Sequence, residues 1–281
     1  VLELLHAAAY KNALSNSLYC PDYNIGKITP DQMHSFVQSN FTSERMVLVG
    51  LGVDHDSVKQ IGQQFLNIRS GKGGVCPKAV YHGGELRHQT GSGLTHTMVA
   101  IEGPSITSAD VTAFGVLQHV LGVGQRVKRA SGNGSRLSHA IGKVTALPFD
   151  VSAFNVNYTD SGLFGIYTIA QANAAKDVVK AAVDQVADVA IGNLSEADLS
   201  KAKNQLLADY LMSLESSDGL ADSVLTQVIS EETYSSPEVV SQKINAVSSE
   251  DVVTAANKFM SGKKTLVSSG DMVNAPFLDD L

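Results

Sequence analysis

The chain has 281 residues, of which 43% are hydrophobic, 17% are charged and 6% are aromatic, and it contains no Trp. Its 21 Lys and Arg against 28 Asp and Glu leave a formal net charge of −7. This composition predicts a folded chain of about two domains and excludes disulfide scaffolds, collagen-like chains and disordered chains. The acidic balance also argues against a nucleic-acid-binding protein, which needs a basic surface to neutralise phosphates.

The sequence holds no segment that is expected to cross a membrane. The longest run of apolar residues and glycines extends from Met46 to Val53, whereas a spanning helix needs about 20 residues. The chain lacks an initiator Met and begins with helical periodicity, so we expect part of the protein to lie upstream of Val1. Cys20 and Cys76 lie far apart without a CxxC spacing, which is typical of a reducing compartment or of two buried thiols.

The first quarter of the chain is predicted to contain three helices and one strand. Residues 1–15 have a helical pattern, and a second helix begins at Thr29, an N-cap that is followed by Pro30. The run of apolar residues and glycines at 45–53 predicts a buried strand. Residues 54–66 have the apolar spacing of another amphipathic helix.

A glycine-rich segment separates this part from the rest. Residues 69–84 hold five glycines and one proline, which is typical of a linker. We therefore divide the chain into a first segment at 1–67, a linker at 68–84 and a second domain at 85–281.

The second domain is predicted to contain strands followed by a long helical part. Strands are expected at 94–102, 148–158 and 162–170, a helix at 108–121, and further helices from residue 174 that begin near 195, 236 and 248, with a last strand at 265–269. The second and third of these strands would form a hairpin. This order predicts an α+β fold in which helices pack on one face of a mainly antiparallel sheet.

Two short motifs resemble a zinc site and a phosphate-binding loop but lack essential residues. The segment from His82 to Glu85 resembles the start of an HxxEH zinc motif, but its two glycines disfavour the helix that such a motif needs. His88 and His96 have no carboxylate or thiol at ligand spacing, and we interpret them as strand or surface residues. The residues 261–265 resemble the end of a phosphate-binding loop, but Asn257 stands where its first glycine is required.

The triplet Asp160-Ser161-Gly162 resembles an aspartic-protease loop, in which two carboxylates share a proton. Only one such triplet is present. Because it lies between two predicted strands, we interpret it as a hairpin turn.

A basic, glycine-containing loop after the helix at 108–121 is the candidate functional segment. It has no hydrophobic period, which predicts either a solvated loop or a surface that binds an acidic segment or a neighbouring subunit. The candidate interface residues are Gly122, Gly124, Arg126, Lys128, Arg129, Gly132, Gly134 and Arg136.

Six segments of the chain resemble a known protein family. They are His6–Asn12, Leu18–Tyr23, Phe41–Met46, Gln118–Gly122, Pro148–Phe154 and Tyr158–Tyr167. This family includes the subunits of the mitochondrial processing peptidase, the core proteins of the cytochrome bc1 complex and the pitrilysin-type zinc peptidases, and the likeness extends over nearly the whole chain. The resemblance implies two similar α+β domains joined by a linker, with 1–67 as the second half of the first domain and 85–281 as the whole second domain. The family's zinc helix lies in the front half of the first domain, so no residue here is expected to bind zinc.

The resemblance also implies a function. It favours a noncatalytic structural core subunit of the respiratory-chain cytochrome bc1 complex, peripheral on the matrix side of the mitochondrial inner membrane. Such a subunit pairs with core protein 1 and other subunits of a complex that dimerises, while haem and quinone bind elsewhere, so no cofactor is expected. The alternative is an α-subunit of a processing peptidase, which binds presequences for a zinc-bearing β partner. The basic loop lies where that α-subunit has a glycine-rich loop, but its glycines are fewer and Arg126, Lys128 and Arg129 interrupt them. A stand-alone peptidase would require a zinc helix upstream of this chain.

Overall fold

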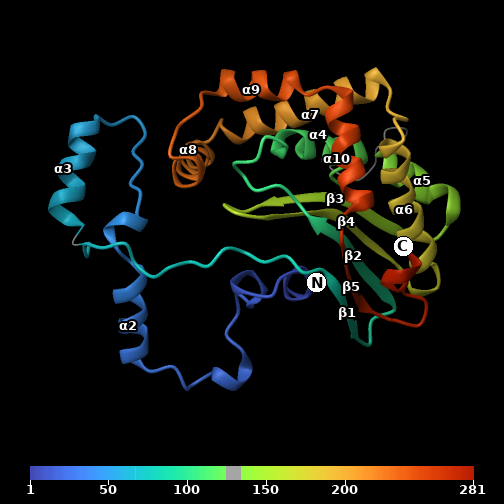
Figure 1. Ribbon diagram of the computed structural model, residues 1–281, viewed down its shortest axis with the longest axis horizontal. Coiled ribbons are helices and arrows are strands. Elements are labelled where there is room, and N and C mark those ends of the chain that lie inside the picture. Colours follow the sequence, from blue (N-terminus) through green and yellow to red (C-terminus); the bar gives the residue numbers. More distant parts are fainter. Residues whose placement is uncertain (67, 125–133) are drawn as a thin grey trace. The chain divides into compact units, whose positions relative to one another are not determined.

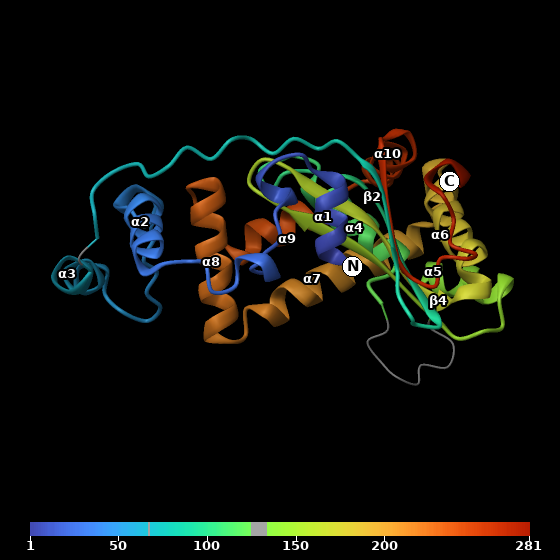
Figure 2. The same ribbon diagram turned by 90° about the horizontal axis from the view of Figure 1, so that it is seen from below.

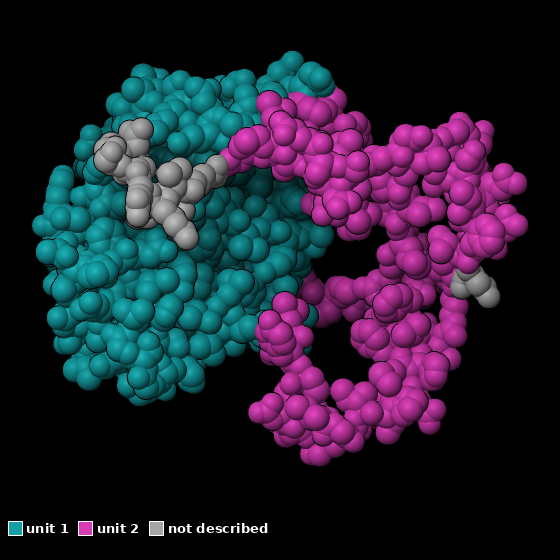
Figure 3. Space-filling view, turned by 180° about the vertical axis from the view of Figure 1, so that it is seen from behind, with its two compact units in different colours: residues 1–16, 79–208, 238–281 teal, residues 17–78, 209–237 magenta. Residues whose placement is uncertain are grey.

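The computed structural model describes residues 1–66, 68–124 and 134–281 (Figure 1). These residues form two compact units, which are coloured separately in Figure 3. Unit 1 consists of residues 1–16, 79–208 and 238–281, and unit 2 consists of residues 17–78 and 209–237.

Unit 1 is built on one five-stranded sheet. The strands are β1 (Gly84–Gln89), β2 (Leu94–Glu102), β3 (Phe149–Asn157), β4 (Gly162–Gln171) and β5 (Lys264–Gly270). Their order across the sheet is β1-β5-β2-β4-β3, and every neighbouring pair is antiparallel except β1 with β5. The predicted hairpin of β3 and β4 and the mainly antiparallel sheet are confirmed.

Helices cover one face of this sheet and enclose the main core, and Figure 2 shows the helices and strands from below. They include α4 (Val111–Leu121), α5 (Arg136–Val144), α6 (Ala175–Ala190) and α10 (Ser249–Ser261). Two further helices, α7 (Glu196–Ser213) and α9 (Pro237–Ala246), lie between α6 and α10 in the sequence. The ring of Phe164 on β4 meets those of Phe114 on α4 and Phe259 on α10 edge to face, with centroids 5.0 and 6.1 Å apart. All three rings are at most 2% exposed, so aromatic packing joins the sheet to two helices.

The opposite face of the sheet is partly covered by α1 (Leu2–Ala9). Leu5 and Ala9 are fully buried and belong to one cluster with Met98, Leu163 and Val267 of the sheet. The predicted helix at 1–15 is therefore shorter, because Tyr10 adopts an extended conformation and forms a β-bridge with Tyr81. This second, smaller core adds a helix to the face that was expected to lack one.

Unit 2 contains helices with almost no core of their own. They are α2 (Pro30–Asn40), which begins with the predicted N-cap Thr29, α3 (His55–Phe65) and α8 (Ser217–Glu231). None of these helices contains a buried residue. Within residues 17–78, apart from the undescribed residue 67, Thr42 alone is buried.

The predicted buried strand at 45–53 is wrong. The segment has no regular structure after residue 45, and Leu48 is 53% exposed. A strand is stable only where a neighbour pairs with its backbone, and the described part of residues 17–78 offers only the isolated bridge of Thr42 with Arg69. No described segment pairs with this apolar sequence.

Three further features differ from the pattern of the sequence. The strand β1 and the helix α5 were not predicted, and Cys20 and Cys76 are exposed, so of the two interpretations of these cysteines the one as two buried thiols is wrong. Short 3-10 helices lie at Ala13–Ser15, Asp22–Asn24, Ser43–Arg45, Ala172–Ala174 and Leu278–Asp280.

The end of the predicted linker belongs to unit 1, where Lys11 N–H donates to Val80 O (3.1 Å). The division at 1–67, 68–84 and 85–281 stays a prediction.

Candidate functional site

The zinc-like motif lies at the start of a strand. Gly84 begins β1, and the carboxylate of Glu85 accepts hydrogen bonds from Arg87 (3.2 Å) and from the Leu278 N–H (2.9 Å). The described residues contain no group of three or more His, Cys, Asp or Glu side chains that could hold a metal ion. The Glu85 side chain therefore has a structural role.

The interpretation of Asp160-Ser161-Gly162 as a hairpin turn is confirmed. Tyr158 N–H donates to Ser161 O (2.8 Å) across the turn, and the Asp160 carboxylate accepts from Ala79 N–H (2.7 Å). Ser161 is 2% exposed, and its hydroxyl donates to the Glu102 carboxylate (3.0 Å). Each of these polar side chains thus fixes a backbone segment or a neighbour.

The two histidines that we interpreted as strand or surface residues lie in strands. His96 on β2 has its Nδ1 atom 2.6 Å from the Tyr167 hydroxyl, and His88 on β1 has its Nδ1 atom 3.3 Å from the Ser269 hydroxyl. At 261–265, α10 ends and β5 begins, and the Lys264 ammonium donates to Met260 O (2.8 Å). Burial lowers the pKa of Lys264. This connection is a helix end and not a phosphate-binding loop.

The candidate interface loop begins at the end of α4, where its first residues are fixed to β3. Gly122 has a φ of 123°, a conformation that favours glycine. Its carbonyl accepts a hydrogen bond from Ala153 N–H (2.8 Å), and the Gln118 side-chain amide donates to Ala153 O (3.1 Å). A Cβ atom at Gly122 would lie 2.1 Å from the Ser135 Cβ. The two ends of the loop therefore meet at Gly122 and Ser135.

The second end of the loop is anchored by α5. Ser135 is the N-cap and its hydroxyl accepts from Ser138 N–H (3.1 Å). Next to it, Arg136 forms an ion pair with Asp188 and donates to Asn193 O (2.8 Å). The hydrogen bond from the Asn193 amide and the Arg136 guanidinium together hold the pKa of Asp188 below its usual value. The loop thus has a fixed base.

Of the eight predicted site residues, four lie in the described part of the chain. Gly122, Gly124, Gly134 and Arg136 lie at the two ends of the loop. Arg126, Lys128, Arg129 and Gly132 lie outside the described residues. The role of all eight as an interface stays a prediction.

A tyrosine network that no sequence pattern predicts binds the first residues to the sheet. The Tyr10 hydroxyl donates to Gly162 O (2.9 Å), and the Tyr81 hydroxyl donates to Lys263 O (2.8 Å). The Tyr158 hydroxyl lies 2.5 Å from the Nε2 atom of His6. Burial raises the pKa of Tyr10, and it raises the pKa of Tyr81 to about 12. These partners are far apart in the sequence, so no local pattern indicates them.

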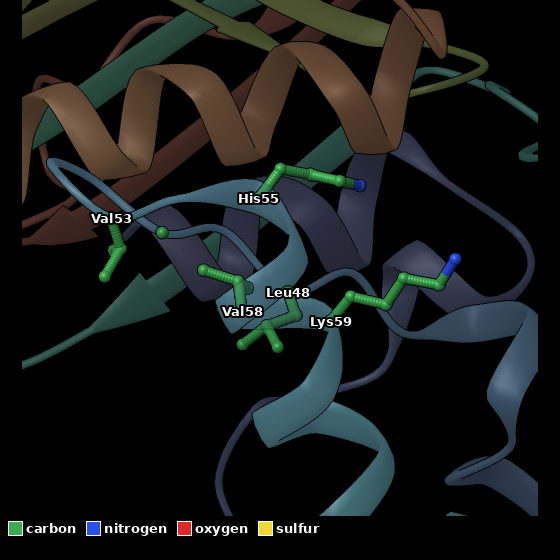
Figure 4. A pocket seen from close by; sticks show the side chains of 6 residues that line it. Leu48, Val53, His55, Val58 and Lys59 are labelled. Atoms are coloured by element: carbon green, nitrogen blue, oxygen red, sulfur yellow. The ribbon is translucent and has the colours of Figure 1, made fainter.

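Unit 2 contains a hollow of about 320 Å³, which Figure 4 shows from close by. Its lining consists of Leu48, Gly50, Val53, His55, Val58 and Lys59. All six residues come from one continuous stretch of 12 residues between positions 48 and 59. The hollow therefore lies within a single loop and helix start.

Among the described residues, no helix is both long and apolar enough to pass through a bilayer. This result covers residues 1–66, 68–124 and 134–281 alone.

Comparison with known proteins places the chain in a family. Residues 27–206 match the family described as "Peptidase M16 inactive domain", and the chain belongs to this family. Two curated relatives, each named "Cytochrome b-c1 complex subunit 2, mitochondrial", from Rattus norvegicus and Homo sapiens, are 53% identical to it over all 281 residues. The chain spans 62% of the length of these two relatives.

Processing-peptidase subunits are more distant relatives. A probable mitochondrial-processing peptidase subunit alpha-1 from Arabidopsis thaliana is 29% identical over 291 aligned residues, which include 100% of this chain and 57% of the relative.

A solved chain described as "Complex III2 from Candida albicans, Inz-5 bound" matches with a TM-score of 0.90 and 16% identity, covering 99% of this chain and 68% of that chain. The structural likeness supports the α+β fold, and the family match identifies this fold as peptidase-like.

Proposed function

We propose that this chain is part of a noncatalytic structural core subunit of the mitochondrial cytochrome bc1 complex. The observation that carries the proposal is the difference in identity between two sets of relatives. The chain is 53% identical over its full length to subunit 2 of that complex in rat and human, but 29% identical to the Arabidopsis processing-peptidase subunit. The inactive-domain family supports the absence of peptidase activity.

The subunit would pair with core protein 1 and lie peripherally on the matrix side of the inner membrane, in a complex that dimerises. Its contribution would be to assembly and stability, while other subunits bind haem and quinone. The α+β unit described above offers a folded body with two packed cores for this purpose.

We further propose that the loop from Gly122 to Arg136 contacts a neighbouring subunit. Its two ends meet at Gly122 and Ser135, and the ion pair of Arg136 with Asp188 anchors it. These contacts fix both ends of the loop on unit 1. Arg126, Lys128 and Arg129 make the loop basic, so an acidic surface is the expected contact.

We also propose that residues 1–67, apart from the packing of α1 on the sheet of unit 1, complete a domain whose front half lies in the part of the protein that precedes this chain. Within residues 17–66 many large apolar side chains are exposed, among them Phe36 (62%), Leu48 (53%) and Phe65 (70%). Apolar surface of this kind is normally covered by other polypeptide. The missing neighbour would also pair with the apolar segment at 45–53, for which a strand was expected.

Native separation of gently solubilised inner membranes tests the main proposal. The protein should migrate in a large assembly together with cytochrome b and core protein 1, and it should carry no zinc of its own. If it migrates instead in a small zinc-containing heterodimer that cleaves presequences, it is a processing-peptidase α-subunit and the proposal is wrong.

The loop is tested by the triple substitution Arg126→Ala, Lys128→Ala and Arg129→Ala in the full-length protein. We expect a lower yield of assembled complex, with unchanged thermal stability of the isolated subunit. A matched control replaces three exposed lysines, Lys143, Lys201 and Lys243, by Ala, which changes the net charge equally. Equal assembly of both triple variants would contradict a specific role of the loop.

A further inference from the structure

One side of β1 holds the backbone of the residues that follow β5. Successive side chains of a strand point to opposite faces, so Glu85, Arg87 and Gln89 share one face. The carboxylate of Glu85 accepts from Leu278 N–H (2.9 Å), and the side-chain oxygen of Gln89 accepts from Met272 N–H (3.1 Å). Side chains at alternate positions of β1 therefore bind backbone groups of the segment 271–281, which we call the strap.

Arg87 makes most of the contacts between β1 and the strap. Its guanidinium donates to three carbonyls, those of Pro276 (2.9 Å), Met272 (3.1 Å) and Ala275 (3.3 Å). It also lies 4.1 Å from the centre of the Phe277 ring and 3.2 Å from the Glu85 carboxylate. The planar fork of N–H donors allows the guanidinium to reach three carbonyls and to stack on a ring at the same time.

The strap has further contacts at both of its ends. At the beginning, the Thr95 hydroxyl donates to Asp271 O (2.7 Å), and at the other end Lys176 lies 3.2 Å from the Asp280 carboxylate. Leu278 and Leu281 pack against the main core of unit 1. In Figure 1 the strap, drawn in red, leaves the end of β5 and returns to the side of α6.

The contacts of the strap differ from those of the strands. The strands β2, β4 and β5 each pair through their backbones with two neighbours, whereas the strap's contacts with β1 run from side chains to its backbone. Among the apolar residues of the strap, Val273 and Phe277 are 82% and 57% exposed, Leu278 and Leu281 are half-buried, and Ala275 and Pro276 are buried. A segment with fewer buried apolar residues than the central strands opens locally at a lower free energy than the sheet does.

We propose that residues 271–281 form a separable strap that opens and closes over β1, and that Arg87 is the positioning residue that latches it. Closing brings Leu278 and Leu281 onto the core, and opening uncovers the core residues on which they pack. The latch recognises backbone carbonyls, so it depends on Arg87 more than on the side chains of the strap. This proposal does not depend on the proposed function.

Hydrogen exchange followed by mass spectrometry on the full-length protein tests the strap. In the Arg87→Ala variant, peptides covering 271–281 should exchange roughly tenfold faster or more, because several hydrogen bonds to a charged group are lost at once. Peptides from β2 and β4 should keep their exchange rates. The Arg87→Lys variant keeps the charge but lacks the fork, so we expect faster exchange in the strap there as well.

The matched control is Lys258→Ala, which removes an ion pair with Asp110 (2.5 Å) elsewhere in unit 1. It should leave exchange in the strap unchanged. Unchanged exchange of 271–281 in both Arg87 variants would overturn the proposed latch. Equal acceleration of the strap and of β2 and β4, or failure of the Arg87→Lys variant to fold, would overturn the proposed separability.

Discussion

Replacing Leu5 by Ala tests whether α1 is an integral part of the sheet's second core. Leu5 is fully buried with Ala9, Met98 and Val267. The substitution removes three buried carbon atoms, which lowers the free energy of unfolding by about 2.4 kcal/mol at ~0.8 kcal/mol per methylene. The cavity left between α1 and the sheet adds to this loss, so we expect a decrease of about 3–4 kcal/mol.

Urea unfolding of the purified full-length protein measures this change, with hydrogen exchange of β1 and β5 as a second observable. Leu2→Ala is the matched control, because Leu2 lies on the same helix but is 51% exposed. We expect this control to change the free energy of unfolding by less than about 0.5 kcal/mol. Equal, small effects of both substitutions would refute the reasoning, since α1 would then not contribute to the core of unit 1.

Three further predictions concern close packing and pH. Gly165→Ala should destabilise unit 1 by about 1–3 kcal/mol in urea unfolding, because its Cβ would lie 2.2 Å from Val99 O; an unchanged midpoint would contradict this. Because the pKa of Tyr81 is raised to about 12, its contribution to the free energy of unfolding is complete below pH 10 and is lost as the pH rises through 12. The Tyr81→Phe variant should therefore lose less stability than the unchanged protein between pH 10 and 12. Because the pKa of Asp188 is lowered, its contribution to the free energy of unfolding is present above its usual pKa of 3.8 and is lost as the pH falls through its lower pKa in the folded protein. Acid unfolding curves of the Asp188→Asn variant should therefore show a smaller loss of stability in this pH range.

The sequence predicted the elements whose signals are local. The N-cap Thr29 forms a capping box with Gln32 at the start of α2, and the N-cap Ser248 forms one with Asp251 at the start of α10. The hairpin turn at Asp160 joins β3 to β4 where expected. Turn and capping residues act through atoms only a few positions away, so they can be recognised without knowledge of the fold.

Only part of the candidate site could be predicted from the sequence. The basic, glycine-containing stretch after α4 marked the loop, since its composition differs from both flanking helices. Its base could not be predicted, because the ion pair of Arg136 with Asp188 joins residues 52 positions apart. The family resemblance, and not any local motif, indicated the function.

Tertiary contacts decided which apolar segments became part of a core. Residues 45–53 carry a strong strand pattern, yet all of them except the half-buried Val49 are exposed, because a strand needs a neighbouring backbone that the described chain does not supply there. The strand β1, with a polar sequence, forms because β5 pairs with it and its side chains bind the strap. The sequence by itself therefore determined the fold class, most helix starts and the turns, whereas pairing partners distant in the chain determined which segments became strands and where α1 lies.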